Sequence, residues 1–247
     1  MTSDFGCFFS NEKPDFFGDS LTAGYALPAA ASFPAVIQTK LDAAGLPYRA
    51  YNYGVSGDTS AGGRQRLAAV LARQPVDAFV LALGANDGLR GIPVRDTTAN
   101  LRFMLQEVGR QFPTAPRVLA GLQVPFDLGP LGLPGLGRYA QEFGALFAEL
   151  ARSEGVGLVP SLLAGVLGRP ALNLPDRIHP NAAGQRGAGR PTCGPCWNLC
   201  CACRGKAGLI FVAAGTGPHP GRSLPPTRAQ PLPMKLPFLH WLRRIST

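Results

Sequence analysis

The stretch from Phe16 to Tyr25, which reads FFGDSLTAGY, most constrains how this chain can fold. Two aromatic residues lead into a Gly-Asp-Ser turn, and a segment of small residues suited to start a helix follows. An apolar run, a tight turn and a helix start place one side chain at the C-terminal end of a strand, beside free N–H groups of a helix. Ser20 is therefore a candidate nucleophile, because these groups can receive the oxyanion formed when it attacks a carbonyl. The alternative is that Ser20 only caps the helix, a common role of serine.

The composition of the chain changes near residue 187. The whole chain has 247 residues and a net charge of +9, but residues 187–247 contain 8 Lys and Arg and no Asp or Glu, so the remainder is nearly neutral. The same 61 residues hold 9 Pro and 8 Gly, a content typical of low-complexity or disordered sequence. We expect an irregular N-terminus at residues 1–14, one folded domain at 15–186, and a Pro/Gly/Arg/Cys-rich tail at 187–247.

The cysteines and the apolar runs bear on the compartment. Cys7 is the only cysteine before the tail, whereas the other five lie between residues 193 and 203. A body with one cysteine fits a reducing compartment. No apolar run approaches the roughly 20 residues of a membrane span, and residues 1–17 lack the basic start and apolar core of an export signal. As written, the chain is expected to stay in the cytoplasm and to span no membrane.

Strand-like and helix-like segments alternate along the body of the chain. The continuous apolar run at 78–83 is typical of a strand buried on both faces. Other strands are expected at 16–17 (shortened by Pro14), 48–53, 117–124 and 156–160, and helices at 34–45, 63–73, 138–153, and from a cap at Thr97 or Thr98 to 112. This order predicts a parallel sheet with right-handed crossovers and helices on both faces. Its ligand site should lie at the carboxyl ends of the strands, where the loops of Ser20, Gly57 and Asn86 share one rim.

One histidine is available to assist Ser20. Of the three in the chain, His219 and His240 lie in the tail, so the body offers only His179. An imidazole suits proton transfer at neutral pH. Asp176, three residues earlier, can bend back to one ring nitrogen and leave the other for the serine. The alternative is a surface loop with a solvated histidine.

Four blocks of the chain together resemble the GDSL/SGNH hydrolase family. They are Phe17–Tyr25, Ser56-Gly-Asp-Thr-Ser60, Gly84-Ala-Asn-Asp-Gly-Leu-Arg-Gly91 and Asp176-Arg-Ile-His-Pro-Asn181, and the resemblance runs from about residue 15 to 185. Within the family, the blocks are similar to those of bacterial multifunctional acyl-CoA thioesterases, lysophospholipases and arylesterases. The resemblance implies a flavodoxin-like three-layer α/β/α sandwich at 15–186 and hydrolysis of acyl esters or thioesters.

The resemblance also implies a role for each site residue. Ser20 would be the nucleophile, His179 the general base and then acid, and Asp176 the residue that orients the histidine. The oxyanion hole would consist of the backbone N–H groups of Ser20 and Gly57 and the side-chain amide of Asn86. For Gly57 and Asn86 a plain turn-forming role stays open, because Gly and Asn are common turn residues.

The substrate is expected to be a small acyl ester or thioester, with no metal, no cofactor and no specific nucleic acid. Leu89, Ile92 and Pro125 are candidates to line the acyl site, and the Leu and Pro content of their loops favours apolar acyl groups over sugar acetates. A carbohydrate acetylesterase is therefore the alternative enzyme. Asp19, Asp58 and Asp87 of the same blocks are interpreted as loop scaffolding.

The tail leaves a rival interpretation open. The family continues into a long terminal helix, but Gly187–Pro191 should break it here. The tail composition suggests the hypothesis of out-of-frame translation. The spacing Cys193-Gly-Pro-Cys196 matches a redox motif, and five crowded thiols could hold zinc. The rival is thus a catalytically impaired family member whose basic tail binds zinc or polyanions.

Overall fold

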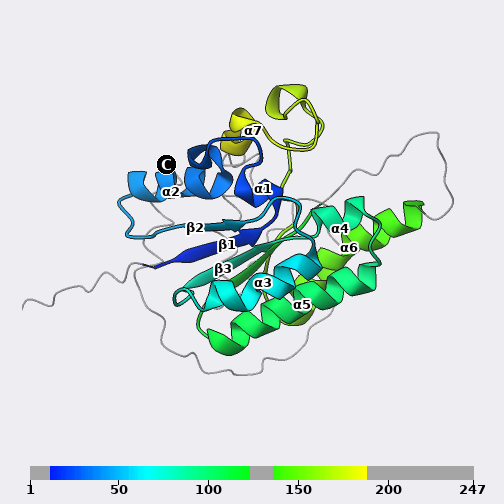
Figure 1. Cartoon of the computed structure of the whole chain (residues 1–247), viewed down its shortest axis with the longest axis horizontal. Helices are drawn as coiled ribbons and strands as arrows, with labels where there is room; N and C mark the ends of the chain where they lie inside the picture. Colours follow the sequence, from blue (N-terminus) through cyan, green and yellow to red (C-terminus); the bar gives the residue numbers. More distant parts are fainter. Residues whose placement is uncertain (1–11, 123–135, 188–247) are drawn as a thin grey trace, which may run out of the picture. The chain divides into compact units, whose positions relative to one another are not determined.

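The structure is a computed structural model that describes residues 12–122 and 136–187 (Figure 1). The expectations for Cys7, for Pro125 and its loop, and for the cysteine-rich tail after residue 187 lie outside these residues.

A five-stranded parallel sheet forms the centre of the described fold. Its strands are β1 (Pro14–Gly18), β2 (Tyr51–Gly54), β3 (Ala78–Ala82), β4 (Arg117–Ala120) and β5 (Gly157–Val159). They are ordered β2-β1-β3-β4-β5, and every neighbouring pair is parallel. This is the flavodoxin-like order, whose ligand site lies where the chain reverses direction, between β1 and β3.

Helices cover both faces of the sheet (Figure 1). They are α1 (Ser20–Ala23), α2 (Phe33–Ala43), α3 (Ser60–Leu71), α4 (Ala85–Leu89), α5 (Val94–Gln111), α6 (Leu136–Glu154) and α7 (Ala182–Gly187), with short 3-10 helices at Ala29–Ala31 and Pro170–Leu172. Helix α2 contacts α7 on one face, while α5 contacts α3 and α6 on the other. The connection from β1 to β2 runs opposite to the three that follow, so right-handed crossovers place its helix on the opposite face. The three-layer α/β/α prediction is confirmed.

Apolar side chains from both helical layers meet the sheet. Strands β1, β3 and β4 are buried over nearly their whole length, as expected of a parallel sheet covered on both faces. On α5 the apolar stripe expected from the sequence is completely buried; it comprises Leu101, Met104, Leu105 and Val108. At roughly 1.5–3 kcal/mol for each fully buried large side chain, this stripe stabilises the position of α5 on the sheet.

The first two strands differ from their expected bounds. Strand β1 begins at Pro14, so it is longer than the sequence suggested. A proline is tolerated there because it is the first residue of the strand. The next residue, Asp15, is fully buried. Strand β2 begins only at Tyr51, and Tyr48 forms an isolated bridge with Glu12.

Two helices start at least three residues earlier than the sequence suggested. Helix α5 begins at Val94, directly after Pro93. The expected cap at Thr97 or Thr98 is wrong, because Thr97 is buried inside the helix and donates a hydrogen bond to Asp87 at 3.2 Å. Helix α3 begins at Ser60 rather than residue 63, and Thr59 caps it by accepting from the N–H of Gly62.

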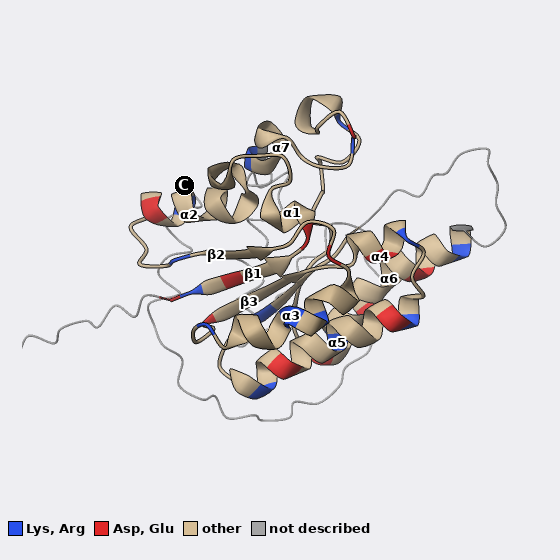
Figure 2. Ribbon diagram, in the orientation of Figure 1, with Lys and Arg blue, Asp and Glu red and all other residues tan. Residues whose placement is uncertain are grey.

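Charged residues are spread along the outer helices of the described fold. Figure 2 shows them scattered over α3, α5 and α6, and none on α1. Some form ion pairs on these helices, such as Arg110 with Glu107 and Arg102 with Glu154. No helix of residues 12–122 and 136–187 is both long and apolar enough to cross a membrane.

Candidate active site

Ser20 is the first residue of α1, immediately after β1. The turn is tight, because a Cβ on Gly18 would collide with the side chain of Thr22 and would lie 2.6 Å from the carbonyl oxygen of Ala82. The Asp19 side chain accepts from the N–H of Leu21 at 2.9 Å and caps the short helix. Ser20 itself is largely buried, with 9% of its surface exposed.

His179 and Asp176 continue from Ser20 as a chain of hydrogen bonds. Nε2 of His179 lies 2.9 Å from Oγ of Ser20, and Nδ1 lies 2.7 Å from Oδ2 of Asp176. The other carboxylate oxygen, Oδ1, accepts from the backbone N–H groups of Ile178 at 2.9 Å and His179 at 3.0 Å. The structure therefore brings together three residues that lie up to 159 positions apart in the sequence.

Two asparagines hold the histidine loop. The buried Asn173 donates to the carbonyl oxygens of Val166 at 2.6 Å and Arg169 at 2.8 Å. Asn181 accepts from the N–H groups of Ala183 and Gly184, and so caps α7. The loop between the asparagines is closed by a backbone hydrogen bond of 2.8 Å from Leu174 to His179.

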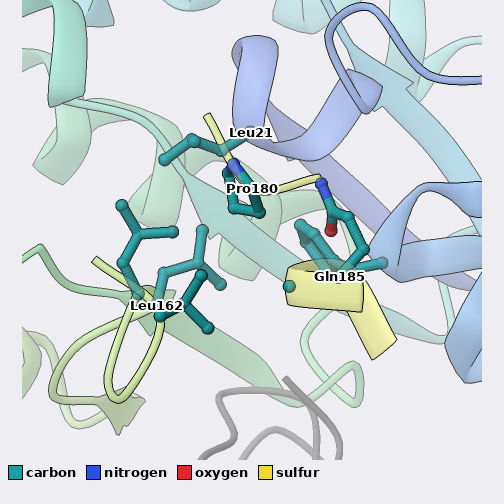
Figure 3. Close-up of a pocket in the computed structure, with 8 residues that line it drawn as sticks. Leu21, Leu162, Pro180 and Gln185 are labelled. Atoms are coloured by element: carbon teal, nitrogen blue, oxygen red, sulfur yellow. The ribbon is translucent and has the colours of Figure 1, made fainter. Parts of the chain in front are cut away.

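An apolar contact fixes the two halves of the site relative to each other. Figure 3 shows Leu21, Leu162, Pro180 and Gln185 around a common space. Leu21 follows Ser20 and Pro180 follows His179, so the packing of these neighbours sets the approach of the two catalytic candidates. The space has a volume of about 10 Å³. It is large enough for one water and too small for an acyl chain.

The loop that carries Gly57 lies beside helix α4, which carries Asn86. Gly57 has φ +83, a left-handed conformation that favours glycine, and a Cβ added at this position would meet nothing within 4 Å. Its carbonyl oxygen accepts from the guanidinium of Arg90 at 3.0 Å. The side-chain amide of Asn86 donates to the carbonyl oxygen of Asp58 at 2.9 Å. An amide nitrogen carries two hydrogens, so a second one is available to a ligand.

Sequence reasoning missed an arginine that links these loops. Arg66 donates to the carboxylate of Asp58 at 2.6 Å and to the carbonyl oxygen of Gly18 at 2.9 Å, and its guanidinium lies 3.9 Å from the ring centroid of Phe17. Asp58 and Arg66 lie eight residues apart across the start of α3, and this spacing is the signal that could have revealed the pair. The contact ties the strand before Ser20 to the loop of Gly57.

Asp87 is a second link between loops. Its buried carboxylate accepts from the N–H of Ser60 at 2.8 Å, from the hydroxyl of Ser60 at 2.5 Å and from Thr97. It therefore joins α4 to the starts of α3 and α5. Together with the cap formed by Asp19 and the ion pair of Asp58, this contact is consistent with the expected scaffolding role of the three aspartates.

Two carboxyl groups next to the site have opposite pKa shifts. Burial would raise the pKa of Asp176, but the hydrogen bonds from the backbone and ring of His179 and from the N–H of Ile178 outweigh it and lower the pKa to about 2. For Asp19 burial dominates the opposing hydrogen bond from Leu21 and raises the pKa to about 7. Asp176 is therefore ionised at neutral pH, whereas Asp19 takes up a proton at a much higher pH than an ordinary aspartate does.

The candidate acyl-site residues occupy different positions. Leu89 is exposed at the end of α4, and Ile92 is half buried, with its carbonyl oxygen accepting from the hydroxyl of Tyr139 at 2.8 Å. Pro125 lies outside the described residues. Tyr25 was not singled out from the sequence as a site residue, yet its ring centroid lies 4.4 Å from that of His179. No group of three or more His, Cys, Asp or Glu side chains within the described ranges could hold a metal ion.

A flavodoxin-like sheet with Ser, His and Asp hydrogen-bonded at its carboxyl edge matches the class of SGNH-type α/β hydrolases. The chain belongs to the GDSL-like lipase/acylhydrolase family, whose model matches residues 16–186. Esterase TesA of Pseudomonas aeruginosa is 38% identical over 168 residues, which cover 68% of this chain and 79% of TesA. The thioesterase 1/protease 1/lysophospholipase L1 of Escherichia coli is 34% identical over 168 residues, which cover 68% of this chain and 75% of that protein.

A solved structure supports the same assignment. The crystal structure of TesA is 36% identical in sequence and has a TM-score of 0.64, covering 70% of this chain and 92% of that chain. These relatives span most of the described fold. The chain is therefore an ester or thioester hydrolase of the GDSL type, as the sequence predicted.

Proposed function

We propose that Ser20, His179 and Asp176 hydrolyse acyl esters and thioesters through an acyl-enzyme. The observation that carries this proposal is the continuous pair of contacts, 2.9 Å from Ser20 to His179 and 2.7 Å from His179 to Asp176. With Asp176 ionised, Nδ1 of the ring holds the proton and Nε2 is left to accept one.

The first half-reaction forms the acyl-enzyme. Oγ of Ser20 bonds to the acyl carbon, its proton moves to Nε2 of His179, and the carbonyl electron pair moves onto oxygen. The resulting oxyanion would be stabilised by the N–H groups of Ser20 and Gly57 and by the amide of Asn86. Collapse of the intermediate breaks the bond to the alcohol or thiol, which leaves with the proton from His179. Water then repeats the sequence and releases the acid.

The contact with Arg90 helps to hold the segment of Gly57 in place. Because the carbonyl oxygen of Gly57 accepts from Arg90, the Gly57–Asp58 peptide is fixed directly after the Ser56–Gly57 peptide, whose N–H is the proposed donor. A glycine also allows the substrate to approach the backbone closely, and Gly57 is exposed in this structure.

For the substrate we propose apolar acyl groups on an aryl, lysophospholipid or coenzyme A leaving group. The Escherichia coli relative is named a thioesterase and lysophospholipase, and the Pseudomonas aeruginosa relative an esterase. The exposed Leu89 and half-buried Ile92 near the site favour an apolar acyl chain over a sugar acetate.

Turnover of p-nitrophenyl butyrate and of a butyryl thioester tests this proposal. Ser20→Ala should abolish both activities, whereas Ser161→Ala should retain them, because Ser161 is equally buried but contacts neither His179 nor Asp176 in the described structure. A zinc assay on the same sample addresses the rival function of the tail. Undiminished turnover in Ser20→Ala, or stoichiometric zinc without any turnover, would overturn the proposal.

A further inference from the structure

Exposed large apolar side chains gather around Ser20. Within the described residues they are Tyr25 (47% exposed), Val55 (46%), Leu89 (58%), Phe103 (39%) and Ile178 (41%). Phe103 lies apart from the site on α5, and the guanidinium of Arg64 lies 4.2 Å from its ring centroid. The other four come from four separate segments at the carboxyl ends of the strands.

These four residues, here called the apolar rim, lie at the same end of the sheet. Figure 1 shows α1, α4 and the loop before α7 at the same end of the sheet. The ring of Tyr25 lies tilted against the ring of His179, and Ile178 precedes His179. The N–H of Val55 donates to the carbonyl oxygen of Gly18 at 3.0 Å, two residues before Ser20. Leu89 lies next to Arg90, whose guanidinium contacts the carbonyl oxygen of Gly57.

The charges next to the apolar rim are mainly positive. Arg90 and Arg177 are exposed beside Leu89 and Ile178. Most acidic residues of the same loops are paired or buried: Asp58 pairs with Arg66, and Asp19 and Asp87 are fully buried, whereas Asp176 is ionised and partly exposed, with its carboxylate against the ring of His179. Arg177 also has φ +60, a left-handed conformation that usually favours glycine over a long side chain.

We propose that the apolar rim, with Arg90 and Arg177, docks this enzyme onto an anionic phospholipid surface. Exposed apolar side chains with arginines beside them suit the boundary between acyl chains and phosphate head groups. Each Arg near such a surface strengthens binding by roughly fivefold. Docking would bring lipid-borne acyl esters close to Ser20, so the inference deepens the proposed function, but binding itself needs no catalytic serine.

Vesicle co-sedimentation separates this surface from a simple acyl pocket. The full chain with Ser20→Ala, which cannot consume lipid, is mixed with vesicles of phosphatidylcholine alone or with about one-third phosphatidylglycerol. The basic residues after 187 are present in every sample, so their contribution cancels between variants. Val55→Ser with Leu89→Ser should weaken binding to the anionic vesicles on the order of tenfold, and Phe103→Ser should leave it unchanged.

The arginine arm uses the same assay. Arg177→Gln should weaken binding by about fivefold, and only to vesicles with phosphatidylglycerol. Arg110→Gln, in the last turn of α5 and away from the apolar rim, should have no effect. If the rim variants bind as Phe103→Ser does, and Arg177→Gln as Arg110→Gln does, the four side chains serve at most a single dispersed substrate and the docking proposal is wrong.

A tryptophan reporter locates the contact. In brominated-lipid vesicles, fluorescence of Leu89→Trp should be quenched beyond the background of Trp197 and Trp241, and that of Phe103→Trp should not. Equal quenching at both positions would contradict docking through the rim. Hydrolysis of dispersed p-nitrophenyl butyrate by the chain with Ser20 intact keeps the two proposals distinguishable: vesicle binding without hydrolysis refutes only the proposed catalytic function, and hydrolysis without rim-dependent binding refutes only the docking.

Discussion

The loop that carries Ser20 and the loop that carries His179 are held in place by different means. Ser20 follows β1, which pairs with β2 on one side and β3 on the other. His179 lies in a partly exposed turn whose hydrogen bonds join residues close in sequence, such as Leu174 and Asp176. The position of the nucleophile thus depends on the whole sheet, whereas the turn of the histidine is held mainly by local hydrogen bonds and meets the rest of the site through Pro180, which lines one space with Leu21.

The aspartates beside these two residues show the same contrast. Burial raises the pKa of Asp19 to about 7, and its Oδ2 has no hydrogen-bond partner within the described residues. Asp176 accepts three hydrogen bonds, and its pKa falls to about 2. A charge close to the reaction is therefore kept on the histidine side and suppressed on the serine side.

The largest expected effect follows from removing the imidazole. His179→Ala should lower kcat by roughly 10⁶, the scale seen when a triad histidine is lost. The thermal unfolding temperature should hardly change, because the local turn does not support the sheet. Steady-state kinetics and calorimetry on one preparation would check both. A variant that lost its fold along with its activity would show that the two loops are not independent.

Asp176→Asn should lower kcat by roughly 10⁴, because a neutral amide no longer fixes the tautomer of His179 or stabilises the imidazolium. The turn should survive, since Oδ1 of asparagine can still accept from Ile178 and His179. The control is Asp96→Asn on α5, which removes another exposed carboxylate and should leave kcat unchanged. A loss below tenfold in Asp176→Asn would contradict the assigned role.

Asn86→Ala tests the oxyanion hole next to Ser20. It should lower kcat by about 10²–10³, with little change in KM, because the amide would act on the oxyanion rather than on the bound ester. Asn86→Asp should lose as much, since it replaces the donor by an acceptor. Rates for both variants can be measured with p-nitrophenyl butyrate. Unaltered turnover in Asn86→Ala would remove this residue from the oxyanion hole.

The smallest effect concerns stability and pH. The pKa of Asp19 is raised on folding, so the folded state holds an extra proton, and the free energy of unfolding should fall as pH rises from about 4 through about 7. Asp19→Asn should remove up to roughly 4 kcal/mol of this decline. Asp15→Asn is the matched control, because Asp15 is also buried and its pKa is also raised to about 7 at the other end of β1.

Urea unfolding at several pH values measures both variants. Each should flatten the stability profile, but only Asp19→Asn should also change the pH dependence of kcat, because only Asp19 adjoins Ser20. If the profile of Asp19→Asn ran parallel to that of the unmodified chain, Asp19 would be ionised in the folded protein throughout this range.

Local patterns predicted much of this fold. Local sequence indicated the conformation of three segments: the apolar run predicted strand β3, the apolar stripe predicted helix α5, and Gly45 marked the end of α2. The candidate general base could likewise be assigned from the sequence, because a serine nucleophile needs a base and residues 1–186 contain only one histidine. Such features need no knowledge of distant contacts.

Long-range contacts account for what the sequence could not predict. Thr97 or Thr98 was expected to cap α5, but the carboxylate of Asp87, which also accepts from Ser60, binds Thr97 inside the helix. Tyr25 reaches His179 only after β1 and the last loop have met. Pro14 extends β1 because it pairs with Ala78 of β3, which lies far away in the sequence.

Labelling with a p-nitrophenyl alkylphosphonate would identify the nucleophile, because a phosphonate reacts with an activated serine and stays attached. The account predicts release of one p-nitrophenol per chain, one adduct by intact mass, and its location on Ser20 after peptide mapping, with labelling lost in His179→Ala. An active enzyme that labels on another residue, or labels equally well without the imidazole, would contradict it.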